Sequence, residues 1–248
     1  MSEQRVALVT GGMGGLGEAI CHALAGAGFT VVTSYSLHND HVPAWLAAQK
    51  AAGFDFSAHQ IDVADYDSCC AGVRAILADK GRIDVLVNNA GITRDATLKK
   101  MSKDDWGLVL RTNLDSVFNM SKQVIEGMTE RRWGRIINIS SVNGQRGSFG
   151  QTNYAAAKAG MHGFTKSLAL ELASKGVTVN TVSPGYLDTA MVREVPAEVL
   201  ATKIIPQIPL ARLGRTDEVA HLVTYLVSEY SDFVTGANFA INGGQHMF

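Results

Sequence analysis

The chain has 248 residues and a formal net charge of -1, and 46% of its residues are hydrophobic. This length suits one large α/β domain, and the balanced charge without a basic block argues against nucleic acid as a partner. The absence of a membrane-length apolar run, of a signal-peptide pattern and of cysteine or histidine motifs predicts a cytoplasmic protein without disulfides or a metal site.

Short apolar strands alternate with helical segments along the chain. We expect strands at residues 5–10, 29–34, 54–63, 83–87, 136–141, 177–182 and 238–241. We expect helices at 18–28, 42–52, 65–80, from 103 with a kink or rebuilt turn around Gly107, at 112–128, 153–174 and 216–229. This alternation predicts a single α/β domain over residues 1–248, doubly wound and Rossmann-like. Its parallel sheet would have about seven strands with helices on both faces.

Five glycines crowd the turn between the first strand and the first helix, where residues 11–17 read GGMGGLG. Glycine permits positive φ and lacks Cβ, so backbone N–H groups and a helix N-terminus can approach a pyrophosphate. Packing alone would hardly require so many glycines in one turn. The strand, glycine turn and helix together therefore predict a nucleotide-binding site.

Tyr154 and Lys158 are four residues apart in the helix expected at 153–174, so they share one helical face. A neighbouring ammonium favours the phenolate and should lower the tyrosine pKa from about 10 toward neutrality. Such a tyrosine can give a proton to a carbonyl oxygen or take one from an alcohol. Ser141, at the end of a strand, could hydrogen-bond the same oxygen. A surface helix with a stray Tyr–Lys pair is the alternative interpretation of this spacing.

Polar and glycine residues follow several of the expected strands. Ligands of doubly wound sheets bind at the carboxyl ends of the strands. Residues that fall at this edge, each just after an apolar run, are Gly12, Asp62, Asn89, Ser141 and Pro184. We therefore expect the nucleotide turn and the Tyr–Lys pair to meet in one crevice.

With these motifs in order, the chain resembles the short-chain dehydrogenase/reductase family over essentially its whole length. The matching blocks are Thr10-Gly11-x-x-x-Gly15-x-Gly17, Asn88-Asn89-Ala90-Gly91, Asn113, Ser141, Tyr154-x-x-x-Lys158 and Pro184-Gly185. More narrowly, the runs NNAGITRDATLKKMSKDDW and NGQRGSFGQTNYAAAKAG and the ending INGGQHMF resemble acetoacetyl-CoA reductases of polyhydroxybutyrate synthesis. Those enzymes are close to the 3-oxoacyl-acyl-carrier-protein reductases of fatty-acid synthesis.

The resemblance implies four catalytic residues: Asn113, Ser141, Tyr154 and Lys158. Tyr154 would be the general acid that protonates the keto oxygen as a hydride reaches the carbon. Lys158 would lower its pKa and hold the nicotinamide ribose. Ser141 would polarise the carbonyl, and Asn113 would hold a water that feeds protons toward Lys158. Taken without the resemblance, Ser141 could be a capping serine and Asn113 a polar interruption of a helix.

The resemblance also implies the residues that bind the cofactor. They are Gly11, Gly12, Met13, Gly14, Gly15, Leu16, Gly17, Ser36, Asp62, Val63, Asn89, Ala90, Gly91, Pro184 and Gly185, with Tyr154 and Lys158. The glycine turn would hold the pyrophosphate, Asp62 the adenine amine, and the segment after the fourth strand the adenine ribose. Asp62 could equally be a turn aspartate, and the asparagines could make only local backbone bonds.

The end of the second strand matches neither usual cofactor pattern. It reads Ser34-Tyr35-Ser36 without the carboxylate that holds the ribose of NAD, and no arginine follows for the phosphate of NADP. The next loop offers only His38, Asn39 and His41, with Asp40 among them. Because the main repulsion against the phosphate is missing, we expect NADP(H), with NAD(H) as the alternative.

For the substrate, the resemblance implies an acyl-CoA thioester, and the reaction would be NADPH-dependent reduction of acetoacetyl-CoA to 3-hydroxybutanoyl-CoA. The acyl and pantetheine pocket would be lined by Asp95, Phe149, Gln151 and Tyr186, under a lid at residues 186–213. Arg193 could attract the CoA phosphates. As alternatives, the two aromatics could pack the lid and Gln151 could cap a helix.

Other functions and the assembly are open at this level. Reduction of a 3-oxoacyl-carrier-protein thioester and a non-catalytic nucleotide-binding regulator are the alternatives. The resemblance further implies a homotetramer, formed through the helices at 112–128 and 153–174 and the C-terminal segment.

Overall fold

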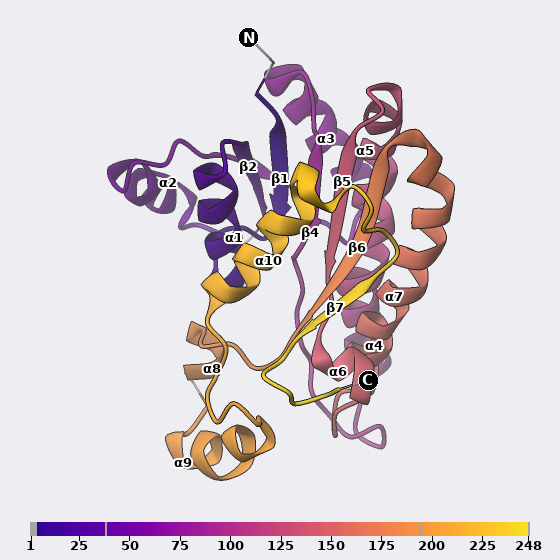
Figure 1. Cartoon of the computed structure of the whole chain (residues 1–248). Helices are drawn as coiled ribbons and strands as arrows, with labels where there is room; N and C mark the ends of the chain where they lie inside the picture. The colour runs from indigo at the N-terminus through magenta and orange to yellow at the C-terminus, as the bar shows by residue number, and fades with distance from the viewer. Residues whose placement is uncertain (1–3, 38, 194, 248) are drawn as a thin grey trace.

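A computed structural model describes residues 4–37, 39–193 and 195–247. These residues form a seven-stranded sheet in the order β3-β2-β1-β4-β5-β6-β7, and every pairing is parallel (Figure 1). The strands are β1 Val6–Thr10, β2 Thr30–Tyr35, β3 Ser57–Gln60, β4 Val85–Asn88, β5 Gly134–Ile139, β6 Val177–Pro184 and β7 Asn238–Ile241. The strand order reverses between β1 and β4, which is where a doubly wound sheet opens its ligand crevice.

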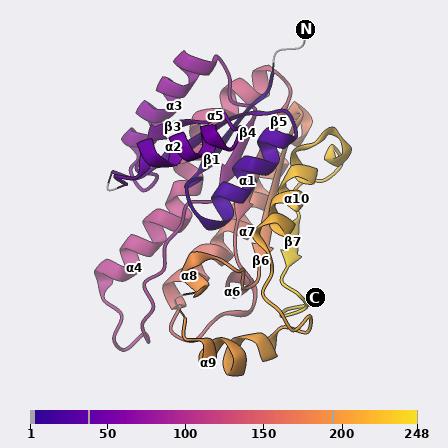
Figure 2. The ribbon, with the colours of Figure 1, turned by 90° about the vertical axis from the view of Figure 1, so that its left-hand side faces the viewer.

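Long helices cover both faces of the sheet. The main helices are α1 Gly15–Gly26, α2 Val42–Ala51, α3 Tyr66–Lys80, α4 Lys103–Leu110, α5 Ser116–Glu130, α7 Thr152–Leu172 and α10 Thr216–Val227. Of these, α4 packs against α7, and α2 contacts the edge strand β3. Helices α1 and α10 pack on one face, and α3, α5 and α7 lie on the other, as the two perpendicular views show (Figures 1 and 2). The predicted doubly wound architecture is confirmed.

The strands form because their side chains are buried on both faces. In β1, Leu8 enters the core beneath α3 and α5, whereas its neighbours Ala7 and Val9 enter the core beneath α1 and α10. All three side chains are fully buried. Alternate side chains of a strand point to opposite faces, so a continuous apolar run is what a sheet covered on both sides requires.

Two predicted boundaries are wrong in an informative way. Strand β3 ends at Gln60, before the predicted end at residue 63, because Asp62 turns the chain by accepting a hydrogen bond from the Ala64 N–H at 3.0 Å. The expected break near Gly107 is also misplaced. Helix α4 runs through Gly107 to Leu110, and the irregular turn is a π-helical segment at Arg111–Asp115.

Smaller elements complete the described chain. Helix α6, Val142–Arg146, follows β5 and lies within a segment for which no helix is predicted. The segment at 186–213 contains α8 Ala190–Arg193, α9 Ala197–Val199, a π-helical turn Leu200–Ile204 and a short helical turn Ile205–Gln207. Within the described ranges, no helix combines the length and apolar character that crossing a membrane requires.

Candidate active site

The glycine turn between β1 and α1 is shaped by two close approaches. A Cβ on Gly12 would overlap Thr33 Oγ1, which accepts a hydrogen bond from the Gly12 N–H at 2.8 Å. A Cβ on Gly17 would overlap the Gly11 carbonyl oxygen. Gly11 itself has φ +64°, a conformation that favours glycine. The turn therefore needs glycine for its own packing.

The outer side of the same turn is open. A Cβ on Gly14 would have no neighbour within 4 Å, and Gly14 is the extended N-cap of α1. Helix N-termini and backbone N–H groups without side chains favour phosphate. The predicted residues Met13, Gly15 and Leu16 complete this turn and the first turn of α1. The turn thus fits the pyrophosphate of a dinucleotide.

Asn89 and Thr10 connect the glycine turn to the loop after β4 by hydrogen bonds. Asn89 Nδ2 donates to the carbonyl oxygens of Thr10 at 3.0 Å and Gly11 at 3.2 Å. Thr10 Oγ1 accepts the N–H groups of Asn89 and Ala90, both at 3.0 Å. Asn89 therefore does more than close a local turn. Thr10, absent from the predicted site, is a buried polar residue that ends an apolar strand, which is the signal that could have identified it.

The other predicted cofactor residues lie at the carboxyl edge of the sheet. Ser36 follows β2 and is exposed, Asp62 and Val63 follow β3, and Pro184 ends β6. Gly185 is required there because its Cβ would lie 2.8 Å from Asn242 Cα. Of the loop predicted to face the ribose, His38 lies outside the described residues. Asn39 Nδ2 contacts Met13 Sδ at 3.6 Å and Asn39 Oδ1 accepts the His41 N–H at 3.1 Å, so the loop after β2 touches the glycine turn.

Gly91 brings the loop after β4 against two predicted catalytic residues. A Cβ at Gly91 would lie 3.1 Å from Asn113 Oδ1 and 3.5 Å from Lys158 Nζ. Asn113 sits in the π-helical turn, fully buried. Its Oδ1 accepts the Ile92 N–H and its Nδ2 donates to the Ile92 carbonyl oxygen, both at 2.8 Å. The side chain of Asn113 is thus engaged in fixing the loop after β4.

Lys158 is buried, and its ammonium points to the end of β5. Its Nζ donates to the Ile139 carbonyl oxygen at 2.7 Å. Burial lowers the pKa of Lys158 to about 8. The Nζ atom lies 5.7 Å from the centre of the Tyr154 ring, so α7 brings the two side chains together as predicted.

The pKa of Tyr154 differs from the sequence-based expectation. Burial of the phenol raises its pKa, and Asp95 and Tyr186 add to this effect, whereas a hydrogen bond with Ser141 opposes it. The lowering expected from Lys158 does not prevail, because partial burial of the phenol disfavours the charged phenolate. The Lys158 ammonium is itself desolvated and is hydrogen-bonded to Ile139. Tyr154 is therefore protonated at neutral pH, the state that a proton donor requires.

Ser141 caps a helix and is also hydrogen-bonded to the phenol of Tyr154. Its Oγ accepts the Asn143 N–H at 3.1 Å, which caps helix α6, and it is hydrogen-bonded to Tyr154. Because α6 begins at the end of β5, the capping bond fixes the serine beside the phenol.

The predicted substrate residues divide into two groups. Gln151 Nε2 donates to Asp95 Oδ2 at 2.8 Å, and Gln151 Oε1 accepts from Asn143 Nδ2 at 2.9 Å. Asp95, Gln151 and Asn143 therefore form a hydrogen-bonded chain. Asn143 in turn donates its N–H to Ser141 at the start of α6. Phe149, in contrast, is 93% exposed, so its ring is free to cover a ligand.

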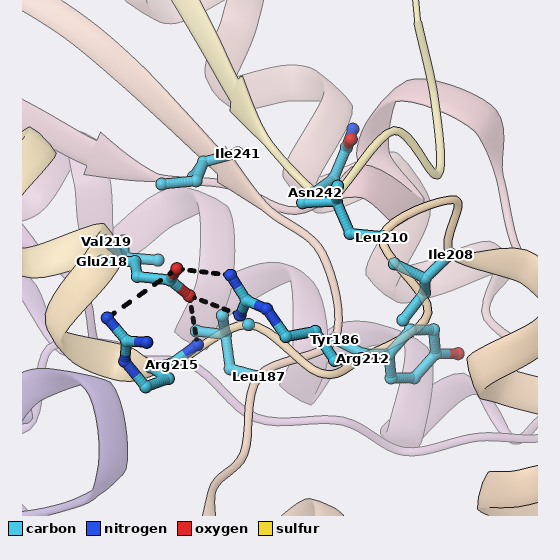
Figure 3. Close-up of a pocket in the computed structure, with 12 residues that line it drawn as sticks. Tyr186, Leu187, Ile208, Leu210, Arg212, Arg215, Glu218, Val219, Ile241 and Asn242 are labelled. Atoms are coloured by element: carbon cyan, nitrogen blue, oxygen red, sulfur yellow. Dashed lines mark hydrogen bonds and ion pairs between the residues drawn. The ribbon is translucent and has the colours of Figure 1, made fainter.

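Tyr186 lies where the two ends of the predicted lid meet. Figure 3 shows its ring with Ile208 and Leu210 from the far end of that segment, around a cavity of about 100 Å³. The ends are joined by hydrogen bonds, from the Gly214 N–H to the Tyr186 carbonyl oxygen at 2.9 Å and from the Asp188 N–H to the Gly214 carbonyl oxygen at 2.8 Å. The two ends of segment 186–213 therefore lie side by side, and the segment forms a loop after β6 that is closed at its base.

Glu218, at the start of α10, stabilises the junction between the two ends of segment 186–213 by ionic hydrogen bonds. It accepts from both terminal nitrogens of Arg212, at 2.9 and 2.7 Å, and from the Arg215 N–H at 2.7 Å (Figure 3). These bonds lower the pKa of Glu218 to about 2. Arg193, considered for the CoA phosphates, is paired with Asp188 at 2.7 and 3.0 Å.

Comparison with known proteins agrees with this geometry. The family model described as short chain dehydrogenase matches residues 5–199. The acetoacetyl-CoA reductase of Cupriavidus necator is 56% identical over 98% of this chain and 99% of that protein. Nodulation protein G of Azospirillum brasilense is 54% identical over 97% of this chain and 98% of that protein. The 3-oxoacyl-acyl-carrier-protein reductase of Pseudomonas aeruginosa is 46% identical over 98% of each.

The matched model covers most of the chain, and the relatives align over nearly their full lengths. The predicted motifs lie at the carboxyl edge of a doubly wound sheet. The chain belongs to the short-chain dehydrogenase family.

Proposed function

We propose that the protein reduces acetoacetyl-CoA to 3-hydroxybutanoyl-CoA with NADPH. The observation that carries the proposal is the meeting of Tyr154, Ser141 and Lys158 beside a glycine turn that fits a pyrophosphate. The name of the Cupriavidus necator relative, an acetoacetyl-CoA reductase, supports the choice of substrate. A regulator without catalysis would not need a protonated phenol bonded to a serine.

The residues of this crevice divide the work of carbonyl reduction. A bound nicotinamide supplies the hydride. Tyr154 donates a proton to the keto oxygen, and the Ser141 hydroxyl holds that oxygen in line with the phenol. Lys158, fixed on Ile139, places its charge beside the tyrosine as the phenolate forms. Asn113 and Gly91 keep the loop after β4 against the lysine.

NADPH is the proposed cofactor because the end of β2 lacks a carboxylate that would repel the ribose phosphate. The glycine turn and residues 62–63, 89–91 and 184–185 form the proposed cradle, and exposed Ser36 follows β2, where the ribose phosphate is expected. The affinities of NADPH and NADH, measured by cofactor fluorescence, test this choice. Tighter binding of NADH would contradict it.

The proposed substrate site lies between the loops after β4 and β5 and the segment 186–213, which we propose is the lid. Phe149 and Tyr186 would contact the acyl and pantetheine parts, while Asp95 and Gln151 would shape the wall through their bond to each other. The rate of NADPH oxidation with acetoacetyl-CoA is the direct test. A 3-oxoacyl-carrier-protein thioester is the second candidate because of the Pseudomonas aeruginosa relative. A kcat/KM for that thioester higher than the value for acetoacetyl-CoA would make the carrier-protein thioester the preferred substrate.

We further propose a cytoplasmic homotetramer. Two large apolar side chains on the helices named for the interface stand in solvent: Phe118 on α5 is 51% exposed and Leu170 on α7 is 85% exposed. Phe118 also stacks on Tyr66 with ring centres 6.1 Å apart. Exposed apolar side chains of this size on both helices support a surface that another subunit covers. The cytoplasm is proposed because it holds the CoA thioester and reduced nicotinamide that this reaction uses.

A further inference from the structure

His162 continues the line of catalytic side chains on α7. Tyr154, Lys158 and His162 are spaced four residues apart, so they follow one another along one face of the helix. His162 is partly buried and has no assigned role in the reaction. His162 lies one helical turn after Lys158, so the partners of its ring bear on the placement of the lysine.

Three consecutive residues at the end of β5 contact the catalytic pair on α7. The Ile139 carbonyl oxygen accepts Lys158 Nζ at 2.7 Å. Ser140 Oγ donates to the Lys158 carbonyl oxygen at 2.8 Å. Ser141 is hydrogen-bonded to Tyr154. The middle residue, Ser140, thus ties the main chain of the catalytic lysine to the strand that also holds its ammonium.

The ring of His162 fixes the hydroxyl of Ser140. His162 Nε2 lies 3.1 Å from Ser140 Oγ and 3.4 Å from Ser183 Oγ. A serine has one hydroxyl proton, and that of Ser140 is directed to the Lys158 carbonyl, which can only accept. The bond between His162 and Ser140 must therefore be donated by Nε2–H.

The second serine contact agrees with this assignment. Ser183 Oγ, fully buried, directs its proton to Asn238 Oδ1 at 2.7 Å, so it too can only accept from the imidazole. Burial and the nearby Lys166 lower the pKa of His162, so its ring is neutral at pH 7. A neutral imidazole carries one N–H, which here is on Nε2.

We propose that His162 is a positioning residue for the reductase reaction: its Nε2–H orients Ser140, which fixes the main chain of Lys158 against the end of β5. The proposal rests on the proposed function for its kinetic part only. Without the donor, the buried Ser140 oxygen loses a partner and its hydroxyl is free to rotate away from Lys158. Small displacements of catalytic groups are costly in rate, so a loss in kcat is expected.

The test compares His162→Leu with His162→Gln, whose amide nitrogen can replace Nε2–H as a donor. We expect His162→Leu to lower kcat for acetoacetyl-CoA reduction about threefold to tenfold with little change in KM, and His162→Gln to recover most of it. Ser140→Ala should lower kcat by the same factor, and the double variant His162→Leu/Ser140→Ala no further. Ser183→Ala, which removes only the longer contact, is the matched control and should retain the wild-type kcat.

Equal kcat values for His162→Leu and His162→Gln, or independent losses that multiply in the double variant, would overturn the proposal. If His162→Leu does not fold, as judged by its melting temperature, then His162→Gln and Ser140→Ala still decide it. A second readout does not depend on activity. Nitrogen-15 NMR of the histidine rings should show His162 protonated at Nε2 and not at Nδ1, and protonation at Nδ1 would refute the assignment even in an active enzyme.

Discussion

Replacing Gly91 by alanine tests whether the loop after β4 fixes the catalytic residues. The added Cβ would lie 3.1 Å from Asn113 Oδ1, about 0.3 Å inside ordinary contact, and 3.5 Å from Lys158 Nζ, which is ordinary contact. Asn113 must therefore shift by a few tenths of an ångström. Its two bonds to Ile92 resist that shift.

A displacement of this size should leave the fold intact and slow the reaction. Gly91 has no positive φ, so alanine adopts its backbone without strain. We expect kcat to fall about threefold to tenfold, given that 1 Å of misplacement costs on the order of a hundredfold. The cost in folding free energy should stay within about 1–3 kcal/mol. The assay is steady-state NADPH oxidation with acetoacetyl-CoA, beside thermal unfolding.

The matched control is Gly26→Ala, at the end of α1, where a Cβ meets nothing within 4 Å. This variant should keep the wild-type kcat. A Gly91→Ala enzyme with wild-type kcat would refute the reasoning, because it would mean that the placement of Asn113 and Lys158 does not limit the rate.

Three further expectations follow from charge and exposure. The rate of reduction should be constant at low pH and fall as pH rises through about 8, because buried Lys158 loses its proton there while Tyr154 stays protonated. A rate that stays constant well above that pH would contradict the role of the lysine. Glu218→Gln removes the charge that holds Arg212 at the base of segment 186–213, so KM for acetoacetyl-CoA should rise severalfold, whereas NADPH affinity should not change. An unchanged KM for acetoacetyl-CoA in Glu218→Gln would show that this junction does not support the substrate site. Phe118→Asp should convert the proposed tetramer to smaller species in light scattering, and an unchanged mass would place the interface elsewhere.

The sheet and its crevice could be predicted because their signals are local. Continuous apolar runs such as that of β1 require burial on both faces, and the glycines at 11–17 directly follow one of them. The positions of Tyr154 and Lys158 relative to the crevice follow from the same alternation. The largest error in strand length falls on the edge strand β3, which is paired to β2 alone and is shorter than predicted.

The remaining features depend on contacts between distant segments. The break in the helix after residue 103 was expected at Gly107 because glycine is a local helix breaker. The π-helical turn instead forms where Asn113 bonds Ile92, a partner 21 residues away. The raised pKa of Tyr154 likewise reflects burial, which a sequence motif does not show.

The same limit applies to the side chains that support the site. Arg193 and Gln151 were considered as ligand-binding groups, and both have protein partners. The sequence does not indicate a role for His162, because its contacts come from Ser140 after β5 and Ser183 in β6, which pack against α7 only in the folded chain. Spacing on one helix can identify a pair of catalytic residues, but it does not reveal what holds them.

The most direct test of the account is to replace Tyr154 by phenylalanine and to measure NADPH affinity and acetoacetyl-CoA turnover on the same preparation. The substitution removes only the phenol oxygen that bonds Ser141. We expect NADPH to bind with nearly unchanged affinity while kcat falls by roughly a hundredfold or more, as loss of a general acid requires. Near-normal turnover in this variant would contradict the assignment of Tyr154 as the proton donor.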